Sequence, residues 1–403
     1  MKLELPRLEI RLIDSNEAFS DLLEGLSQTS GPLGIDAERA SGFRYSQKAY
    51  LIQICDGVFN WLIDPVGIED PELWNSLRDE MSSRLWILHA ATQDLPCLSE
   101  LGLIPTKIFD TEVAAKLLGL EKVGLGSLAS TLLDFELAKE HSASDWSIRP
   151  ISKEMLVYAA LDVDILFELE HSLSQRLIQL GRQDWMLQEM DHLVNFKPKP
   201  QKIQPWRSLP GVSKFRDPLQ VQIAAALWIA RDEIARSQDI APGRLIPDRS
   251  ISLAATAKPK SKSELARNKE FHGRASRSML DVWWNAIENS TTIDVSEKMD
   301  QDPNFIPNHR SWEKRFPEAH ARLERVRPRI LQLASELEIP QENLLSPDTL
   351  RRICFSPEGD IPAQLQALRA RRWQIELVSD LITESLREPD LNPVQAETSH
   401  EEL

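Results

Sequence analysis

The sequence contains few cysteines, no long hydrophobic run and no pair of histidines with the spacing of a zinc site. Its three cysteines, Cys55, Cys97 and Cys354, form no disulfide framework, which favours a reducing compartment. The longest apolar run, residues 223–230, is too short to span a membrane. The segment MKLELPRLEIRLID is charged and lacks the apolar core of a signal peptide. These absences predict a cytoplasmic protein.

Two common catalytic motifs are also absent. The sequence has no Walker A phosphate-binding loop and no G-x-S-x-G nucleophile elbow. A GLGS stretch at residues 124–127 follows a predicted helix, so it indicates a turn and not a nucleotide-binding loop. P-loop nucleotidases and α/β-hydrolases are therefore poor candidates.

The first 165 residues do contain carboxylates inside segments that read as hydrophobic core. Asp36 and Glu38 lie two residues apart in a predicted strand, so their side chains share one face. Asp94 follows another predicted strand and begins a helix. Tyr158 and Asp162 lie one turn apart on a predicted helix. Because buried carboxylates cost free energy unless they are paired or bind a cation, their convergence would predict a divalent-metal site.

Taken together, these five residues resemble the signature of the DEDDy exonucleases, and ribonuclease D in particular. The order and spacing agree, and the flanking segments YLIQICDG and SDWSIRPIS are also similar. The family usually has Thr between its first two acids, where this sequence has Ala37. That side chain is expected to point away from the site. Asp36, Glu38, Asp94, Tyr158 and Asp162 are therefore the predicted catalytic residues, and the four carboxylates the predicted metal ligands.

The resemblance implies a 3′–5′ exoribonuclease that trims RNA 3′ ends, those of tRNA precursors among them, and releases nucleoside 5′-monophosphates. Two Mg²⁺ or Mn²⁺ ions about 3.5–4 Å apart would be the cofactors. By the same resemblance, Asp36 bridges both ions, and Glu38 and Asp162 complete the site that activates water. Asp94 supports the ion at the leaving 3′ oxygen, and Tyr158 orients the water.

The predicted fold is an α/β ribonuclease H-like exonuclease domain, with a mixed sheet flanked by helices, followed by two small all-α domains of the HRDC type. Five strands are expected in the first domain, at residues 8–13, 33–39, 50–56, 59–64 and 85–90. A weak internal repeat with an offset of 99 residues supports the second helical domain. The predicted boundaries are 1–196 for the exonuclease, 197–206 for a linker, 207–290 and 300–388 for the helical domains, and 389–403 for an acidic disordered tail.

Charge is unevenly distributed along the chain. Residues 1–196 contain 16 Lys and Arg against 32 Asp and Glu, residues 197–280 contain 17 against 7, and the remainder contains 14 against 23. The basic middle block is therefore the predicted nucleic-acid-binding region, although a solvated domain surface would look the same. The predicted RNA contacts are Gln53, Arg149, Lys214, Arg216, Arg244, Lys258, Lys260 and Lys262. For Arg149 the alternative is a salt bridge, and for Gln53 a hydrogen bond inside the core.

Two other functions fit the same residues. One is a DNA 3′–5′ exonuclease, which would differ in its use of the ribose 2′-hydroxyl. The other is a non-catalytic RNA-binding protein, whose signature would be the loss of a carboxylate; none is lost here.

Overall fold

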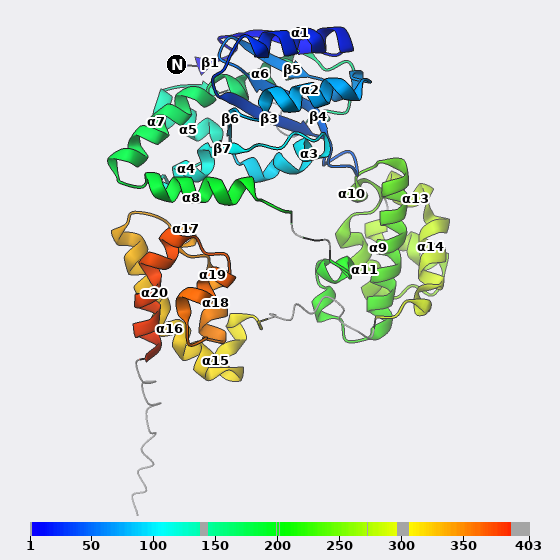
Figure 1. Cartoon of the computed structure of the whole chain (residues 1–403). Helices are drawn as coiled ribbons and strands as arrows, with labels where there is room; N and C mark the ends of the chain where they lie inside the picture. The colour runs from blue at the N-terminus through cyan, green and yellow to red at the C-terminus, as the bar shows by residue number, and fades with distance from the viewer. Residues whose placement is uncertain are drawn as a thin grey trace, which may run out of the picture. The chain divides into compact units, whose positions relative to one another are not determined.

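The computed structural model describes residues 2–137, 144–198, 200, 202–271, 273–295 and 306–387. The predicted acidic tail lies outside the described residues. The chain forms two compact units (Figure 1). Unit 1 comprises Met1–Thr106, Glu136–Leu166 and Phe196–Pro303, and unit 2 comprises Lys107–Phe135, Phe167–Asn195 and Asn304–Leu403. The predicted exonuclease domain therefore contributes segments to both units.

A mixed β-sheet forms the centre of unit 1. The strands of this sheet that belong to unit 1 follow the order β2-β5-β4-β3-β6. β4 runs antiparallel to both of its neighbours, whereas β2 is parallel to β5 and β6 is parallel to β3. All five predicted strands are present: β2 (Glu9–Ile13), β3 (Leu33–Arg39), β4 (Ala49–Cys55), β5 (Phe59–Ile63) and β6 (Leu85–Leu88). A separate parallel pair joins β1 (Lys2–Leu3) to β8 (Glu136–Leu137).

Burial explains why β4 lies inside the sheet. All seven of its residues are buried, which is typical of a strand whose two faces are both covered. β2, by contrast, keeps four of its five residues at least partly exposed. The continuous apolar segment thus takes the interior position, and the more polar segment takes the outer one.

Four α-helices accompany this sheet: α1 (Asn16–Ser27), α2 (Pro71–Met81), α3 (Leu95–Glu100) and α6 (Lys153–Asp164). Ser15 and Ser152 begin α1 and α6, each by accepting a hydrogen bond from the backbone N–H three residues later. α6 packs against β3, β4 and β5. One helix therefore covers the part of the sheet that contains Asp36 and Glu38.

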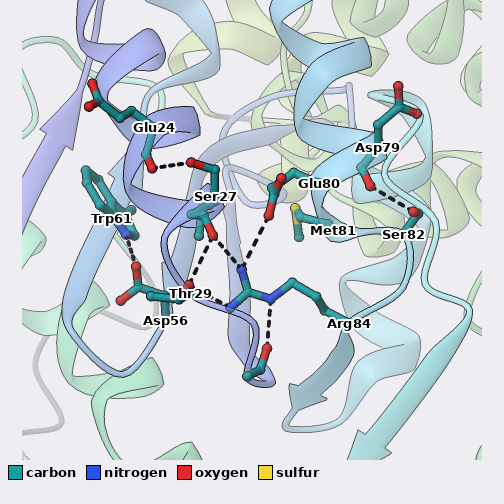
Figure 2. Close-up of polar contacts among 12 residues, drawn as sticks. Glu24, Ser27, Thr29, Asp56, Trp61, Asp79, Glu80, Met81, Ser82 and Arg84 are labelled. Carbon is teal, nitrogen blue, oxygen red and sulfur yellow. Dashed lines mark hydrogen bonds and ion pairs between the residues drawn. The ribbon is translucent and has the colours of Figure 1, made fainter.

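Figure 2 shows how a buried arginine connects the segments that lead to the site. Arg84, directly before β6, donates from Nε to the Gly31 carbonyl at 2.7 Å, from Nη1 to the Leu26 carbonyl at 3.3 Å and from Nη2 to Thr29 Oγ1 at 3.0 Å. The Glu80 carboxylate lies 3.9 Å from Nη1. These contacts tie the turn between α1 and β3 to the start of β6, and so fix the two strands relative to each other.

The first helical domain belongs to unit 1. Its helices are α9 (Pro218–Gln238), α10 (Pro242–Leu245), α11 (Asp248–Ala257), α12 (Lys262–Arg267), α13 (Arg274–Ser278) and α14 (Leu280–Glu288). α11 and α14 both pack on α9 around a core that includes the fully buried side chains of Phe271 and Trp283. The long helix α9 is therefore the central helix of this domain.

Unit 2 combines the remaining exonuclease segments with the second helical domain. The exonuclease segments form β7 (Lys107–Asp110), α4 (Thr111–Leu117), α5 (Leu125–Leu133), α7 (Leu166–Gln179) and α8 (Gln183–Val194). The second helical domain consists of α15 (Trp312–Arg315), α16 (Pro317–Glu336), α17 (Gln341–Leu344), α18 (Pro347–Phe355), α19 (Ile361–Ala367) and α20 (Arg372–Arg387). No helix in the described ranges of either unit is long and apolar enough to cross a membrane.

The internal repeat is visible in the structure. α9, α10 and α11 begin 99 residues before α16, α17 and α18, respectively. After each long helix comes a residue in the left-handed conformation, Asp239 with φ 49° and Glu338 with φ 54°. We call the turn from the end of each long helix into the next short helix a corner; the first lies between α9 and α10, and the second between α16 and α17. Both corners contain the same backbone hydrogen bond, from the Ile240 N–H to the Ala235 carbonyl and from the Ile339 N–H to the Ala334 carbonyl, each at 3.0 Å. The two helical domains therefore share one local geometry.

Candidate active site

β3 supplies two of the predicted carboxylates. Asp36 and Glu38 lie on the same face because side chains alternate along a strand. In the ladder between β3 and β4, Asp36 lies opposite Gln53. The register shifts between Glu38 and Arg39, a bulge of the kind that is common beside active sites. The D-x-E pair therefore lies at the irregular end of a central strand.

Asp94 lies after β6 and at the start of a helix, as predicted, although a short 3₁₀ turn that was not predicted separates it from the strand. It follows the 3₁₀ turn η2 (Ala91–Gln93) and directly precedes α3. Its side chain is buried, and Arg39 Nη2 lies 3.9 Å from its Oδ1. Cys97 Sγ lies 3.1 Å from the Asp94 carbonyl oxygen, so Cys97 packs beside Asp94. The sequence analysis missed Arg39, whose only signal was its position directly after Glu38.

α6 supplies the remaining two residues. Tyr158 and Asp162 lie one turn apart, and their side chains share a hydrogen bond. Asp164, buried on the same helix, accepts hydrogen bonds from Arg7 Nε and Asn60 Nδ2, each at 2.9 Å. These contacts fix the C-terminal end of α6. The sequence analysis missed this role of Asp164, although the residue belongs to the same L-D-V-D segment as Asp162.

The carboxylates from these separate elements converge. Asp36, Glu38 and Asp162 each place one oxygen so that the three oxygens lie within 4.8 Å of one another. Asp36 also shares a hydrogen bond with Asp94. The strand β3, the turn before α3 and the helix α6 thus bring four acidic side chains together. This convergence agrees with the prediction from their spacing.

The electrostatics of the cluster favour bound cations. Burial raises the pKa of Asp36 to about 6. Burial, together with the charges of Asp36, Asp162 and Asp94, raises the pKa of Glu38 to about 10. Burial and the charge of Asp36 also raise the pKa of Asp162 well above its ordinary value. Carboxyls that resist ionisation in this way need protons or positively charged ligands to offset their repulsion.

Tyr158 is held in its neutral form beside this cluster. Burial, followed by the charges of Asp162 and Glu38, raises the pKa of its hydroxyl. Its ring lies 6.4 Å from the ring of the fully buried Trp146, measured between centroids. Trp146 also belongs to the hydrophobic cluster that Tyr158 packs against. The position of the hydroxyl is therefore set by packing on one side and by Asp162 on the other.

Two predicted RNA contacts are buried or already engaged. Gln53 is fully buried, and its side-chain amide has no hydrogen-bond partner within the described ranges. Arg149 forms two hydrogen bonds with the Asp64 carboxylate, at 2.5 and 2.8 Å, and donates to the carbonyls of Trp146 and Tyr50 at 2.6 and 2.7 Å. The geometry of Arg149 therefore favours the salt bridge over a phosphate contact.

The predicted contacts of the basic block differ in their surroundings. Lys258 pairs with Asp217 at 2.7 Å, and Lys262 pairs with Asp281. Arg244 Nε donates to a backbone carbonyl of the loop after β3. Lys214, Arg216 and Lys260 are exposed, and within the described part of the chain no ion pair is recorded for them. RNA contact by these residues stays a prediction.

Comparisons with known proteins identify the domains of the chain. A family profile described as a 3′–5′ exonuclease matches residues 10–178, an HRDC domain matches residues 220–287, and a 3′ to 5′ exonuclease C-terminal domain matches residues 305–386. Ribonuclease D of Zymomonas mobilis is 30% identical over 294 residues, which cover 71% of this chain and 74% of that protein.

Solved structures show the same architecture. A protein from Bifidobacterium adolescentis is 33% identical with a TM-score of 0.86, and the match covers 96% of this chain and 99% of that one. Escherichia coli RNase D shares the fold at 22% identity, with a TM-score of 0.69 over 94% of this chain and 99% of that one. The fold and the acidic cluster define a 3′–5′ exonuclease. The chain belongs to the ribonuclease D family, and it is a 3′–5′ exoribonuclease.

Proposed function

We propose that this enzyme trims the 3′ ends of structured RNAs, tRNA precursors among them, with divalent cations held by its acidic cluster. The observation that carries the proposal is the convergence of three carboxylate oxygens within 4.8 Å. The related E. coli enzyme is described as an exoribonuclease involved in structured RNA processing. Cytoplasmic localisation stays a prediction from the sequence.

The donor set fits hard cations. Asp36, Glu38 and Asp162 would hold them, with Asp94 adjoining through Asp36. Carboxylate oxygens are the ligands that Mg²⁺ and Mn²⁺ prefer. When bound, two such ions would polarise the scissile phosphodiester and lower the pKa of the attacking water.

The residues of the chain prepare the site for this chemistry. Tyr158 keeps its proton at neutral pH because its pKa is raised, so it does not act as a general base. Because that proton is donated to Asp162, the hydroxyl oxygen can accept a hydrogen bond from water and orient it. Asp162 accepts from that hydroxyl and fixes its direction. Arg39 lies beside Asp94 and partly offsets the negative charge. In this proposal, cleavage releases a nucleoside 5′-monophosphate and leaves a new 3′-hydroxyl.

Cation binding can be tested without measuring activity. Since the pKa of Glu38 is raised to about 10 and that of Asp162 is raised above its ordinary value, binding of Mn²⁺ at neutral pH should release protons, and affinity should rise with pH. Calorimetry in buffers of different ionisation enthalpy measures this release. Absence of Mn²⁺ binding would contradict the proposal.

The raised pKa values also set the sign of the pH effect on stability. Between pH 4.5, the ordinary pKa of Glu, and about 10, the cation-free folded protein binds more protons than the unfolded chain. Its free energy of unfolding should therefore fall as pH rises through this range. Added Mn²⁺ should restore most of the loss.

The substrate is tested with a digestion panel of 3′-tailed tRNA, unstructured RNA and single-stranded DNA. We expect 3′-to-5′ release of nucleoside monophosphates from both RNAs, complete inhibition by EDTA and recovery with Mg²⁺ or Mn²⁺. Faster degradation of DNA than of either RNA would favour the DNA exonuclease instead. Full activity in EDTA would contradict the acidic cluster as the site.

A further inference from the structure

Gln53 of β4 is a buried polar side chain whose amide has no hydrogen-bond partner in the described part of the chain. None of its surface is exposed, and both Nε2 and Oε1 are unpaired there. Burying a polar group in this way costs free energy, because the group loses its hydrogen bonds to water. Gln53 therefore needs a partner beyond the side chains packed around it, either an ordered water or a group that becomes available when a ligand binds.

The sheet places Gln53 beside the acidic cluster. In the antiparallel ladder between β3 and β4, Gln53 lies directly opposite Asp36. The side chains of directly opposed residues project from the same face of a sheet, with Cβ atoms about 4.5–5.5 Å apart. Because the amide of glutamine lies two carbon atoms beyond Cβ, it is within reach of the Asp36 carboxylate.

The face that carries Gln53 is covered by α6, the helix that supplies part of the acidic cluster. Leu51 lies two residues before Gln53 on β4, and Leu62 lies directly opposite it on β5. Both leucines belong to a buried cluster with Ala159 and Ala160 of α6. Since alternate residues of a strand share a face, Gln53 is enclosed between the sheet and α6, on the side where the carboxylates converge.

Asp36 has room for a further hydrogen bond. It accepts from the backbone N–H of Ala37 and shares a hydrogen bond with Asp94. A carboxylate offers about four lone-pair sites, and carboxylates that bind metals are usually held by donors outside the ligand set. An amide suits this position, because it donates without adding a positive charge that would compete with the cations.

We propose that Gln53 is a positioning residue for the cations of the acidic cluster, and that its Nε2 donates to the Asp36 carboxylate when those cations are bound. The presence of the cations rests on the proposed function. A carboxylate that a neutral donor holds in one direction binds a cation without first having to be ordered. Gln53 acts through Asp36 and touches neither the cations nor the RNA.

A second unpaired atom defines the competing explanation. Asn60 of β5 lies opposite Cys55, which is two residues after Gln53 and on the same face. Asn60 Nδ2 donates to Asp164 at 2.9 Å, whereas its Oδ1 has no partner among the described residues. An ordered water shared by Gln53 and Asn60 would satisfy both side chains. Gln53 would then stabilise the fold whether or not cations are bound.

The test compares Gln53→Met with the matched control Leu62→Met in the full-length protein. Both variants place a flexible side chain of similar size, without an N–H donor, at adjacent positions on one face of the sheet. Calorimetry with Mn²⁺ measures cation affinity, and urea unfolding in EDTA measures the stability of the fold without cations.

We expect Gln53→Met to bind Mn²⁺ about tenfold more weakly than the wild type, as is typical when a donor outside the ligand set is lost. Its urea midpoint in EDTA should equal that of the wild type or exceed it, because two unpaired buried atoms are removed. Leu62→Met should bind Mn²⁺ within about twofold of the wild type, since it changes packing next to Gln53 and leaves the amide in place.

The opposite directions of the two effects distinguish a positioning residue from a structural one. A lower urea midpoint for Gln53→Met than for Leu62→Met, or failure of Gln53→Met to fold in EDTA, would overturn the proposal and favour the shared water. Equal losses of Mn²⁺ affinity in the two variants would also overturn it, because altered packing would then be the cause.

The proposed function and this inference fail in different ways. If the wild-type protein does not bind Mn²⁺, the proposed function fails. If the wild type binds Mn²⁺ and Gln53→Met binds it within about twofold as tightly, only the inference fails.

Discussion

In both helical domains, the turn after the long helix contacts exonuclease segments of the same unit. The interactions that make these contacts differ between the two domains. Arg244 and Asn343 occupy equivalent positions in the repeat, 99 residues apart. Arg244 Nε donates to the Gly42 carbonyl at 2.7 Å, and Asn343 Nδ2 donates to the Lys116 carbonyl at 3.0 Å. A shared local geometry therefore serves the same purpose, docking onto backbone carbonyls, in each unit.

The first corner, at Asp239, depends on hydrogen bonds that one carboxylate accepts. Asp239 Oδ1 accepts from the backbone N–H groups of Tyr45 and Ser46 at 3.1 and 2.8 Å, and its Oδ2 accepts from the Tyr50 hydroxyl at 3.3 Å. Partial burial acts against ionisation, but these hydrogen bonds outweigh it and lower the pKa of Asp239. The loop that it holds follows directly after β3, the strand of Asp36 and Glu38.

The second corner depends on aromatic packing and a buried ion pair. The rings of Trp185 and Trp373 stack with centroids 4.5 Å apart. Glu189 accepts from Trp373 Nε1 at 3.0 Å and pairs with Arg371 at 2.6 Å. The left-handed residue at this corner, Glu338, is exposed. The difference shows that a side chain can form docking hydrogen bonds in one domain while the side chain at the equivalent position in the other domain is exposed.

The largest expected effect is on turnover, and it should come from the acidic cluster and not from either corner. Asp36→Asn keeps the size of the side chain and removes a charge at the centre of the acidic cluster. We expect turnover to fall at least about a thousandfold, the order of a principal electrostatic contribution to catalysis. Single-turnover degradation of unstructured RNA measures this loss, while thermal unfolding should show both domains still docked. Near wild-type turnover would place the active site elsewhere.

The second corner should dominate stability. Trp373→Ala removes the stacked ring and leaves Glu189 without one of its donors, so we expect a loss of about 3 kcal/mol or more in the free energy of unfolding. Urea unfolding measures it. Turnover on a short RNA, measured well below the unfolding midpoint, should stay within about twofold. A loss of stability below about 1 kcal/mol would show that the stacking contributes little to docking.

The first corner should give a smaller effect, and the repeat offers a matched control. Asp239→Gly keeps the left-handed backbone and removes three hydrogen bonds, so we expect a loss of about 1–2 kcal/mol. Glu338→Gly makes the same backbone change where the side chain is exposed, and should be neutral or slightly stabilising. Asp239→Asn should recover part of the loss, because its amide oxygen still accepts from Tyr45 and Ser46. Equal effects of the two Gly variants would remove the distinction between the corners.

Sequence periodicity predicted the central site because its geometry is local. Residues two apart on a strand, or four apart on a helix, share a face in any fold, so Asp36 with Glu38 and Tyr158 with Asp162 could be paired in advance. Asp94 followed from its place between a strand and a helix. The predicted strands were also recovered, since each is a hydrophobic segment between turn residues.

Elements whose pattern is weak, and partners that are distant in sequence, were not predicted. The sequence analysis missed α1 and β7, a polar-faced helix and a four-residue strand. It also gave no means to see that Arg149 faces Asp64, 85 residues away, or that Arg244 faces Gly42, 202 residues away. A basic residue in a sequence carries no sign of whether its partner will be a phosphate or a carbonyl.

The smallest effects should separate docking from RNA binding inside the basic block itself. Arg244 holds the loop after β3, and its guanidinium carbon lies 4.0 Å from the centroid of the Phe43 ring. Arg244→Gln should therefore cost about 1 kcal/mol of stability and leave RNA affinity within about twofold. Lys260 is exposed, and its side chain has no recorded ion pair within the described residues.

Lys260→Gln should show the opposite pattern, with unchanged stability and RNA binding about two- to threefold weaker at low salt, as expected for the loss of one phosphate contact. Anisotropy at two salt concentrations measures RNA affinity, and thermal unfolding measures stability, for both variants. If Arg244→Gln weakens RNA binding as much as Lys260→Gln and leaves stability unchanged, Arg244 contacts RNA after all. The corner of the first helical domain would then both dock and bind RNA. The equivalent residue of the second domain, Asn343, carries no charge and could not bind phosphate in the same way.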